Sequence, residues 1–274
     1  MKLLNFDPLR EEKYSPLPGL IHKYSNRVLV MITSRCAEYC CFCTRKRIKN
    51  ADFEITEKQI LAIKKYLLKN HKIKEVIFSG GDPLMAPGTF LRALNILGKV
   101  KSIKIIRVHT RLPISSGRLL SRKILSAFAA ERSKPIYLCL HVNRLNEINP
   151  EAIATIECLR KTGIILLSQT VFIRGFNDSV SILEKLFSRL IELGVKPYYI
   201  FHCDPVRGNE KYIVGINKEI EIMSQLRRRL SGLAFPLHTV DAPGGSGKVP
   251  APTDFWTKDR RHFRDFRGNK IEIY

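Results

Sequence analysis

Three cysteines with the spacing of a metal cradle are the residues of this chain best suited to chemistry. Cys36, Cys40 and Cys43 follow a short apolar run in a C-x3-C-x2-C pattern. Three thiolates from one short loop can hold three irons of a four-iron four-sulfur cluster. Because such a cluster usually takes four cysteines, one iron stays open to another ligand. The pattern therefore predicts chemistry at an open iron.

Two other uses of these cysteines fit the sequence less well. A structural zinc site closes with four ligands, and no second Cys or His pair follows downstream. A disulfide fits the sequence even less well, because no secretory context is visible. Cys41 is expected to be a bystander, since neighbouring residues point apart.

The elements that must position this loop alternate along the chain. From residue 27 onward, short β-branched apolar runs alternate with segments of helical period, which predicts an α/β fold with a parallel βα array. Six such units favour an open partial barrel over a closed eight-stranded one, with ligands at the carboxyl ends of the strands. The expected strands are 27–33, 75–79, 103–109, 136–141, 164–172 and 198–203, and the expected helices are 56–68, 89–97, 119–130, 150–161, 181–193 and 217–230.

Several further motifs fall at predicted strand ends. Segment 78–85, FSGGDPLM, has adjacent glycines that let a backbone approach a ligand closely, although alone it is more typical of a strand-to-helix turn. His141, Asn143 and Gln169 are expected to point into the mouth of the barrel. Segment 241–248, DAPGGSGK, is not a P-loop, because the spacing fails and valine follows the lysine.

The cysteine triplet and six further segments between Tyr24 and Lys248 resemble the radical S-adenosylmethionine enzymes, and among them the lysine 2,3-aminomutase family. The resemblance covers roughly residues 20–270. It implies an isomerase that moves the α-amino group of L-lysine to the β-carbon. The implied cofactors are a 4Fe-4S cluster, S-adenosylmethionine and pyridoxal phosphate.

The resemblance also implies roles for individual residues. Lys248 would be the catalytic lysine linked to pyridoxal phosphate, with Tyr24 against the ring and Arg27 at the phosphate. Lys23 stands where the family has arginine, which keeps the charge without the bidentate geometry. The cluster ligands would be Cys36, Cys40 and Cys43, and S-adenosylmethionine would be bound by Ser79, Gly80, Gly81, Asp82, His141 and Gln169.

Substrate choice follows from charge. By resemblance, Arg45 receives the substrate carboxylate, and Asp204 and Asp241 clasp its distal ammonium. Paired carboxylates repel each other unless a cation lies between them, so lysine is preferred over glutamate. Ser179 stands where zinc-binding relatives have cysteine, and no zinc is predicted.

Length, composition and net charge predict the domain organisation and the partners. Its 274 residues, 45% apolar and 26% charged, predict one large domain: an extension at 1–26 that contributes to the pyridoxal phosphate site, a barrel at 27–250, and a tail at 251–274 packing on the core. The net charge of +22 comes with no nucleic-acid motif, so such a partner is not expected. A cytoplasmic protein with no membrane helix is expected, with a donor such as flavodoxin or ferredoxin; the oligomeric state stays open.

Three alternatives to this function stay open. The same chemistry could supply β-lysine for modification of elongation factor P. The second alternative is a radical S-adenosylmethionine enzyme of other specificity. The third is a basic metal-binding protein without enzymatic activity, which salt-sensitive binding to nucleic acid would favour.

Overall fold

The chain is built around one nine-stranded sheet, in a computed structural model that describes residues 6–48, 51–131, 133–253, 262–265, 267 and 269–272. The strands are paired in chain order from β1 to β9. The pairs from β2 to β8 are parallel, and β1 and β9 join the two edges antiparallel. Their bounds are β1 (Leu20–Tyr24), β2 (Arg27–Thr33), β3 (Glu75–Gly80), β4 (Ile105–Thr110), β5 (Ile136–His141), β6 (Ile165–Val171), β7 (Lys196–Phe201), β8 (Leu237–Ala242) and β9 (Gly247–Pro250).

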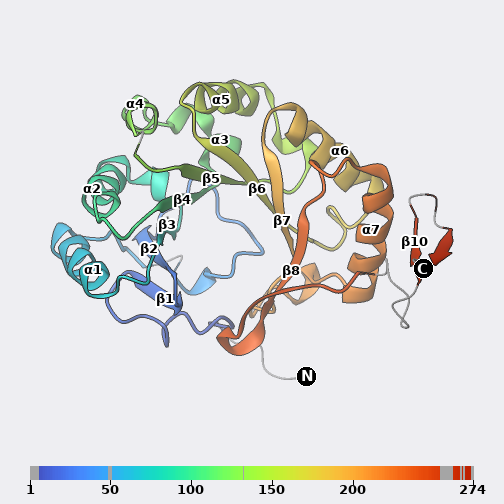
Figure 1. Ribbon diagram of the computed structural model, residues 1–274, viewed down its shortest axis with the longest axis horizontal. Coiled ribbons are helices and arrows are strands. Elements are labelled where there is room, and N and C mark those ends of the chain that lie inside the picture. Colours follow the sequence, from blue (N-terminus) through green and yellow to red (C-terminus); the bar gives the residue numbers. More distant parts are fainter. Residues whose placement is uncertain are drawn as a thin grey trace.

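Helices follow the parallel strands and cover the outer side of the curved sheet (Figure 1). Sequence signals start several of them: Thr56 and Gln59 form a capping box before α1, and Asn149 caps α5 with a proline in its first turn. None of the described helices is both long and apolar enough to cross a bilayer. Their bounds are α1 (Glu57–Lys69), α2 (Pro87–Gly98), α3 (Leu112–Ser115), α4 (Arg122–Ala130), α5 (Pro150–Lys161), α6 (Val180–Glu192) and α7 (Ile216–Arg229).

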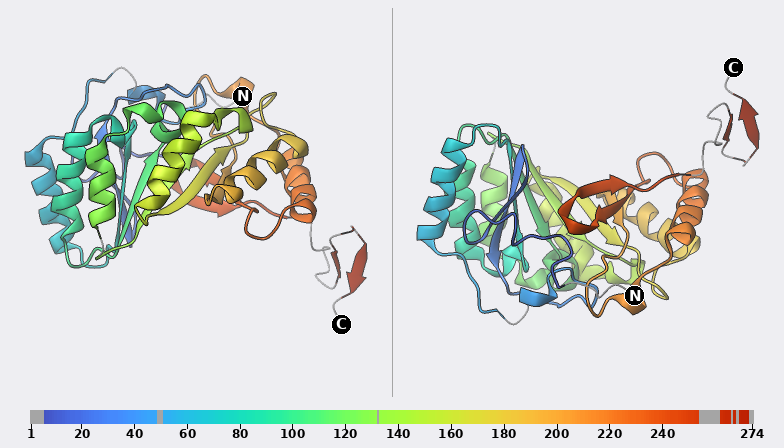
Figure 2. Two further views of the ribbon diagram at one scale, coloured as in Figure 1. Left: turned by 90° about the horizontal axis from the view of Figure 1, so that it is seen from above. Right: turned by 90° about the horizontal axis from the view of Figure 1, so that it is seen from below.

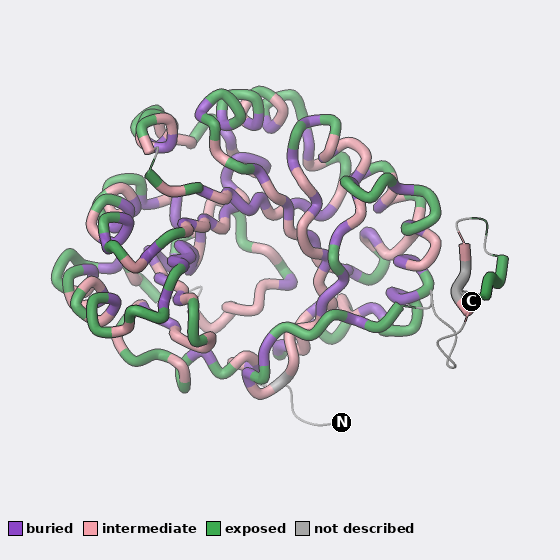
Figure 3. The backbone as a smooth tube through the Cα atoms, in the orientation of Figure 1, coloured by how far each residue is buried: buried purple, intermediate pink, exposed green. Residues whose placement is uncertain are grey.

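The main hydrophobic core lies between the sheet and these helices. Alternate residues of β2, Val28, Val30 and Ile32, are buried toward it, because successive side chains of a strand point to opposite faces. Phe78 of β3 and Phe90 of α2 pack edge to face at 5.5 Å between ring centroids. Figure 3 shows many buried residues along the sheet and many exposed residues on the surrounding helices. The other face of the sheet is left for a site.

The fold predicted from the sequence is confirmed, and the number of strands was underestimated. All six expected strands and all six expected helices are present within a few residues of their predicted bounds. Strand β8 adds a seventh parallel strand. Its sequence, LHTVDA, has two polar residues in succession and forms no apolar run. The short edge strands β1 and β9 were also missed, and β1 pairs with β2 across the expected boundary at residue 26.

The last strands form a separate pair. Strands β10 (His262–Arg264) and β11 (Lys270–Glu272) make a two-stranded antiparallel sheet, drawn apart from the barrel in Figure 2. Residues 254–261, which connect this pair to the barrel, lie outside the described residues, and the packing of the tail at 251–274 on the core stays a prediction.

Candidate active site

A cavity of about 460 Å³ opens inside the barrel at the carboxyl ends of the strands. Its size suits a small-molecule site. The loop after β2 enters the space enclosed by the sheet (Figure 1) and carries the three cysteines. Every residue to which the resemblance assigns a role lines this central cavity: Tyr24, Arg27, Cys36, Cys40, Cys43, Arg45, Ser79, Gly80, Gly81, Asp82, His141, Gln169, Asp204, Asp241 and Lys248.

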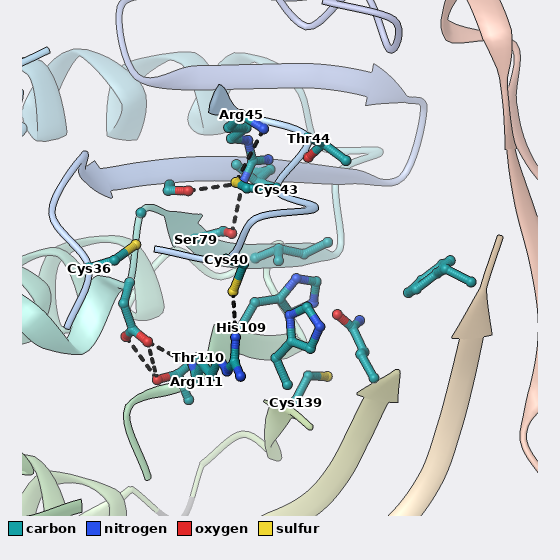
Figure 4. A pocket seen from close by; sticks show the side chains of 18 of the residues that line it. Cys36, Cys40, Cys43, Thr44, Arg45, Ser79, His109, Thr110, Arg111 and Cys139 are labelled. Carbon is teal, nitrogen blue, oxygen red and sulfur yellow. Dashed lines mark hydrogen bonds between the residues drawn. The ribbon is translucent and has the colours of Figure 1, made fainter. Parts of the chain in front are cut away.

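The three cysteines of the pattern are free thiols around one side of the cavity (Figure 4). Arg111 donates from Nη1 to Cys40 Sγ at 2.7 Å, and the backbone N–H of Arg45 donates to Cys43 Sγ at 3.3 Å. Such donors stabilise thiolates that bind a cluster and adjust its reduction potential. Cys41 is exposed and is not part of the lining.

These thiols fit a cluster better than a single ion. Among the described residues, no three His, Cys, Asp or Glu side chains converge on one metal position. A four-iron cluster does not need that convergence, because each thiolate binds a different iron. Burial, Asp82 and the neighbouring thiols raise the pKa of Cys36 to about 12. The thiol therefore keeps its proton until a metal displaces it, since metal binding and deprotonation are coupled.

The glycines at the end of β3 pack against the segment that leads into the cysteine loop. Gly80 has φ of +122°, and a Cβ there would lie 2.6 Å from the carbonyl oxygen of Thr33. A Cβ on Gly81 would lie 2.4 Å from the carbonyl oxygen of Arg35. The Gly81 N–H donates to Thr33 O at 2.6 Å. Glycine is thus needed at both positions to bring the two loops together.

Asp82 is buried beside the cavity, and its carboxylate is already engaged. It accepts from the Thr110 hydroxyl at 2.8 Å and from the backbone N–H groups of Leu84, Arg111 and Leu112 at 3.1, 2.7 and 2.9 Å. These bonds fix the end of β4 to the end of β3. Asp82 therefore positions Arg111, the residue that donates to Cys40.

His141 and Gln169 are adjacent across β5 and β6, and both face the cavity. Burial and then Arg111 lower the pKa of His141 to about 3, so its imidazole is neutral. Its Nε2 is buried and has no hydrogen-bond partner among the described residues. A bound ligand would supply one.

The expectation for Asn143 was wrong. Its side chain is fully buried behind the strand ends and is absent from the cavity lining. Asn143 Oδ1 accepts from the Val171 N–H at 2.8 Å, and Asn177 Nδ2 donates to the Asn143 carbonyl at 3.0 Å. The residue connects the ends of β5 and β6. A strand end predicts proximity to the site, but the direction of a side chain beyond the strand depends on the loop.

His109 is a residue of the cavity that the sequence analysis missed. It lies at the end of β4, and Figure 4 shows it near Cys40 and Cys139. Its Nε2 is also buried without a partner among the described residues. Burial, Arg107 and Lys248 hold its pKa well below the usual value, so the imidazole is neutral. A polar residue two positions after Arg107 in an apolar strand was the available signal, because both share one face.

Residues expected at pyridoxal phosphate gather where the two edges of the sheet meet. The Lys248 N–H donates to the Tyr24 phenol oxygen at 3.0 Å, and the Arg27 guanidinium lies 3.7 Å from the centroid of the Tyr24 ring. Lys23 also lines this part of the cavity. Three cations and one aromatic ring form a donor set that fits an aromatic cofactor with a phosphate.

Two carboxylates lie at the ends of adjacent strands and share one cation. Asp204 follows β7, and Asp241 lies in β8. The Lys248 ammonium is 2.6 Å from Asp241 and 4.1 Å from the centroid of the Phe201 ring. Burial and then Asp241 raise the pKa of Asp204 to about 7. This corner of the cavity can therefore hold a further positive charge.

Arg45 is held by a carboxylate of the chain itself. Arg45 Nε and Nη2 donate to Glu11 at 3.0 and 2.7 Å, and Nη1 donates to Ser79 Oγ and to the Gly80 carbonyl at 3.1 and 3.2 Å. Four of its five N–H donors are engaged, which leaves one for a ligand. Glu11 was missed by the sequence analysis, because nothing local indicates a partner 34 residues away.

The chain is similar to known proteins over most of its length. Residues 30–186 match the Radical SAM superfamily. An L-lysine 2,3-aminomutase of Buchnera aphidicola is 34% identical over 244 residues, which cover 89% of this chain and 72% of that protein. An L-lysine 2,3-aminomutase of Fusobacterium nucleatum is 36% identical over 267 residues, which cover 96% of this chain and 62% of that protein. This chain thus spans about three fifths of the length of that relative.

A solved structure is similar in fold. It is a radical SAM methyltransferase from Sphaerobacter thermophilus, with a TM-score of 0.58 and 20% sequence identity. The match covers 81% of this chain and 67% of that one.

Proposed function

Because this chain belongs to the radical SAM superfamily and, within it, to the lysine 2,3-aminomutase family, we propose that it converts L-lysine to β-lysine. It is an aminomutase, and the choice of lysine is the proposed part. One observation carries that choice: the cavity that contains three free cysteines also contains Lys248 and the carboxylates of Asp204 and Asp241. The residues proposed for radical chemistry and those proposed for a cationic side chain thus line the same cavity.

The residues of the cavity divide among three cofactors. Cys36, Cys40 and Cys43 would hold the cluster, and Lys248 with Tyr24 would hold pyridoxal phosphate. When bound, the cluster supplies an electron that cleaves S-adenosylmethionine to a 5'-deoxyadenosyl radical, and pyridoxal phosphate carries the migrating amino group. S-adenosylmethionine would be bound by Ser79, Gly80, Gly81, His141 and Gln169, with Asp82 shaping that loop, and Arg27 would hold the phosphate.

The protein itself binds and orients the substrate. Asp204 and Asp241 would bind the distal ammonium, and the remaining N–H of Arg45 would bind the carboxylate. His109 is neutral and buried, so it can donate a hydrogen bond to the bound substrate without taking up a proton. Holding the reacting carbons inside the barrel would limit their contact with water, which protects a radical from side reactions.

An electron donor is the expected protein partner. A one-electron carrier such as flavodoxin or ferredoxin would reduce the cluster, and a net charge of +22 favours an acidic one. A reducing compartment such as the cytoplasm suits the free thiols.

Anaerobic reconstitution tests the proposal. The protein is loaded with iron, sulfide, S-adenosylmethionine and pyridoxal phosphate, then reduced in the presence of L-lysine, with Cys36→Ala as the matched control. The expected result is β-lysine from the wild type and none from the variant. Cleavage of S-adenosylmethionine without any β-lysine would contradict the substrate and leave the radical chemistry standing.

A further inference from the structure

A buried carboxylate between two imidazoles lies just outside the central cavity. Glu219 of α7 is fully buried, and the fraction of His238 that is exposed is 5%. Glu219 Oε1 is 3.0 Å from His202 Nδ1, and Oε2 is 2.9 Å from His238 Nε2. None of the three residues lines the cavity. Burying a carboxylate is costly unless it is paired, so this arrangement needs an explanation.

The two imidazoles belong to the strands that carry the substrate carboxylates. His202 directly follows β7 and precedes Asp204 by two residues. His238 lies in β8, three residues before Asp241, so the two side chains point to opposite faces of the sheet. The His202 N–H donates to the Thr239 carbonyl at 3.0 Å, which joins the two strand ends. Glu219 therefore holds, from the helix side, the strands whose other side binds the substrate.

The hydrogen bonds indicate which imidazole is charged. His238 Nδ1 is buried and has no partner among the described residues. A proton there would be buried without an acceptor, so His238 is assigned as neutral, with its proton on Nε2 facing Glu219. The negative charge of Glu219 is then balanced by His202. Although burial opposes it, the hydrogen bond and charge of Glu219 raise the pKa of His202.

His202 acts in turn on Asp204. Burial and then Asp241 raise the pKa of Asp204. Lys248 and His202 lower this pKa, and Glu11 raises it slightly. Of these four groups only Lys248 and His202 carry positive charge. The proposed function engages the Lys248 amine with a cofactor, which leaves His202 to oppose the repulsion from Asp241.

The thiol beside the triad does not replace that charge. Cys203 lies between His202 and Asp204 in the chain, and burial with Asp204 and Glu219 raises its pKa to about 12. It stays a neutral thiol. On the far side of His238 the Phe172 ring packs edge to face at 5.3 Å between centroids.

We propose that Glu219 is a positioning residue for substrate specificity: its carboxylate holds the His202 imidazole two residues from Asp204, and so favours the ionised form of Asp204 that receives a cationic side chain. This inference rests on the proposed function for the identity of the cation. It adds that the preference for a distal ammonium is set partly from outside the cavity, by a residue that touches neither substrate nor cofactor.

The test is the pH dependence of lysine binding. KM and Kd for L-lysine are measured on the reconstituted enzyme from about pH 5.5 to 8.5, for wild type and Glu219→Gln. With Lys248 as a free ammonium the pKa of Asp204 is about 7, and engaging that amine with the cofactor should raise it; wild-type binding should improve as pH rises through this midpoint. In Glu219→Gln the midpoint should move up by about one pH unit, which raises KM about fivefold at the wild-type midpoint and about tenfold well below it, with kcat little changed.

Two controls separate this effect from a structural one. Glu221→Gln removes the same charge from an exposed position of α7 and should leave the midpoint unchanged. L-norleucine lacks the distal ammonium, so its inhibition constant should not change in Glu219→Gln. A purely structural role would weaken lysine and norleucine alike at every pH.

A direct titration keeps the inference independent of the substrate. Carbon-13 NMR of the labelled holoenzyme reports the Asp204 carboxyl, assigned by its loss in Asp204→Asn. The midpoint should rise in Glu219→Gln and also in His202→Gln, which keeps a donor for Glu219 but no charge. An unchanged midpoint in either folded variant would refute the role of the triad, whereas a shifted midpoint without lysine turnover would refute the proposed function alone.

Discussion

The phenol oxygen of Tyr24 accepts a hydrogen bond from the backbone N–H of Lys248 at 3.0 Å, across 224 positions of sequence. Tyr24 ends β1 and Lys248 lies in β9, so this bond joins the two edges of the sheet at the cavity. Gly247 makes this turn of the chain possible, because its φ of +104° is one that L side chains rarely adopt. The proposed pyridoxal phosphate site is thus built by closing the barrel.

Tyr24→Phe tests that closure. It keeps the ring and removes the bond, so the affinity for pyridoxal phosphate should fall about fivefold, the equivalent of about 1 kcal/mol for one hydrogen bond. Tyr24→Ala also removes the ring and should bind more weakly still. Absorbance titration of the cofactor into each variant measures both. Equal affinities for wild type and Tyr24→Phe would show that the bond does not position Lys248.

Replacing Cys36, Cys40 or Cys43 with Ala should abolish the cluster, because each thiolate is expected to bind a separate iron. Iron content and visible absorbance after anaerobic reconstitution measure this. Cys41→Ala is the matched control, and it should keep the cluster because Cys41 is exposed outside the cavity. Loss of the cluster in Cys41→Ala but not in Cys40→Ala would reverse the assignment.

Lys248→Ala should lose the covalent link to pyridoxal phosphate while Tyr24 and Arg27 still bind the cofactor weakly. Cleavage of S-adenosylmethionine should survive, and amino migration should fail. Borohydride reduction followed by mass spectrometry should place the cofactor on the peptide that contains Lys248 in the wild type. A cofactor fixed to any other lysine would overturn the assignment.

Glu11→Gln should destabilise the protein by about 3 kcal/mol, because it leaves the largely buried guanidinium of Arg45 without its carboxylate. Although burial alone would raise it, Arg45 and Arg47 lower the pKa of Glu11 to about 2. A lowered pKa means that the stabilisation is present above the unfolded value of 4.5 and is lost as pH falls toward 2. Urea unfolding at several pH values measures the difference.

The pH profile identifies the cause of that loss. The gap in stability between wild type and Glu11→Gln should narrow below about pH 4. Glu12→Gln is the control, since its side chain is 79% exposed and lies 3.4 Å from Arg47. If the difference in stability between wild type and Glu11→Gln did not depend on pH, the destabilisation would come from lost packing.

Asp241→Asn should weaken lysine binding by about 2 to 5 kcal/mol, the cost of removing one partner of a desolvated charged pair. L-norleucine should lose far less, because only a cation needs both carboxylates. Glutamate should be rejected by the wild type, since a third carboxylate would be repelled. Competition kinetics with the three amino acids measures this. Equal losses for lysine and norleucine would contradict the specificity.

The repeating βα order, the cysteine loop and many of the residues that line the cavity could be predicted from the sequence. These features are local: strand and helix periods are set by neighbouring residues, and parallel strands bring their carboxyl ends to one edge. All the residues taken from the resemblance therefore line one space. Strand β8 was missed because its sequence, LHTVDA, shows neither an apolar run nor a strict alternation of polar and apolar residues.

The partners of those residues could not be predicted from the sequence, because they come from distant parts of the chain. Glu11 reaches Arg45 over 34 positions, Asp82 reaches Thr110 over 28, and Glu219 joins imidazoles on two different strands. Asn143 is absent from the cavity lining for the same reason, since its loop and not its strand sets its direction. Hydrogen bonds and charge interactions depend on the distance between two groups in space. Their separation in the sequence does not predict that distance, because folding brings distant parts of the chain together.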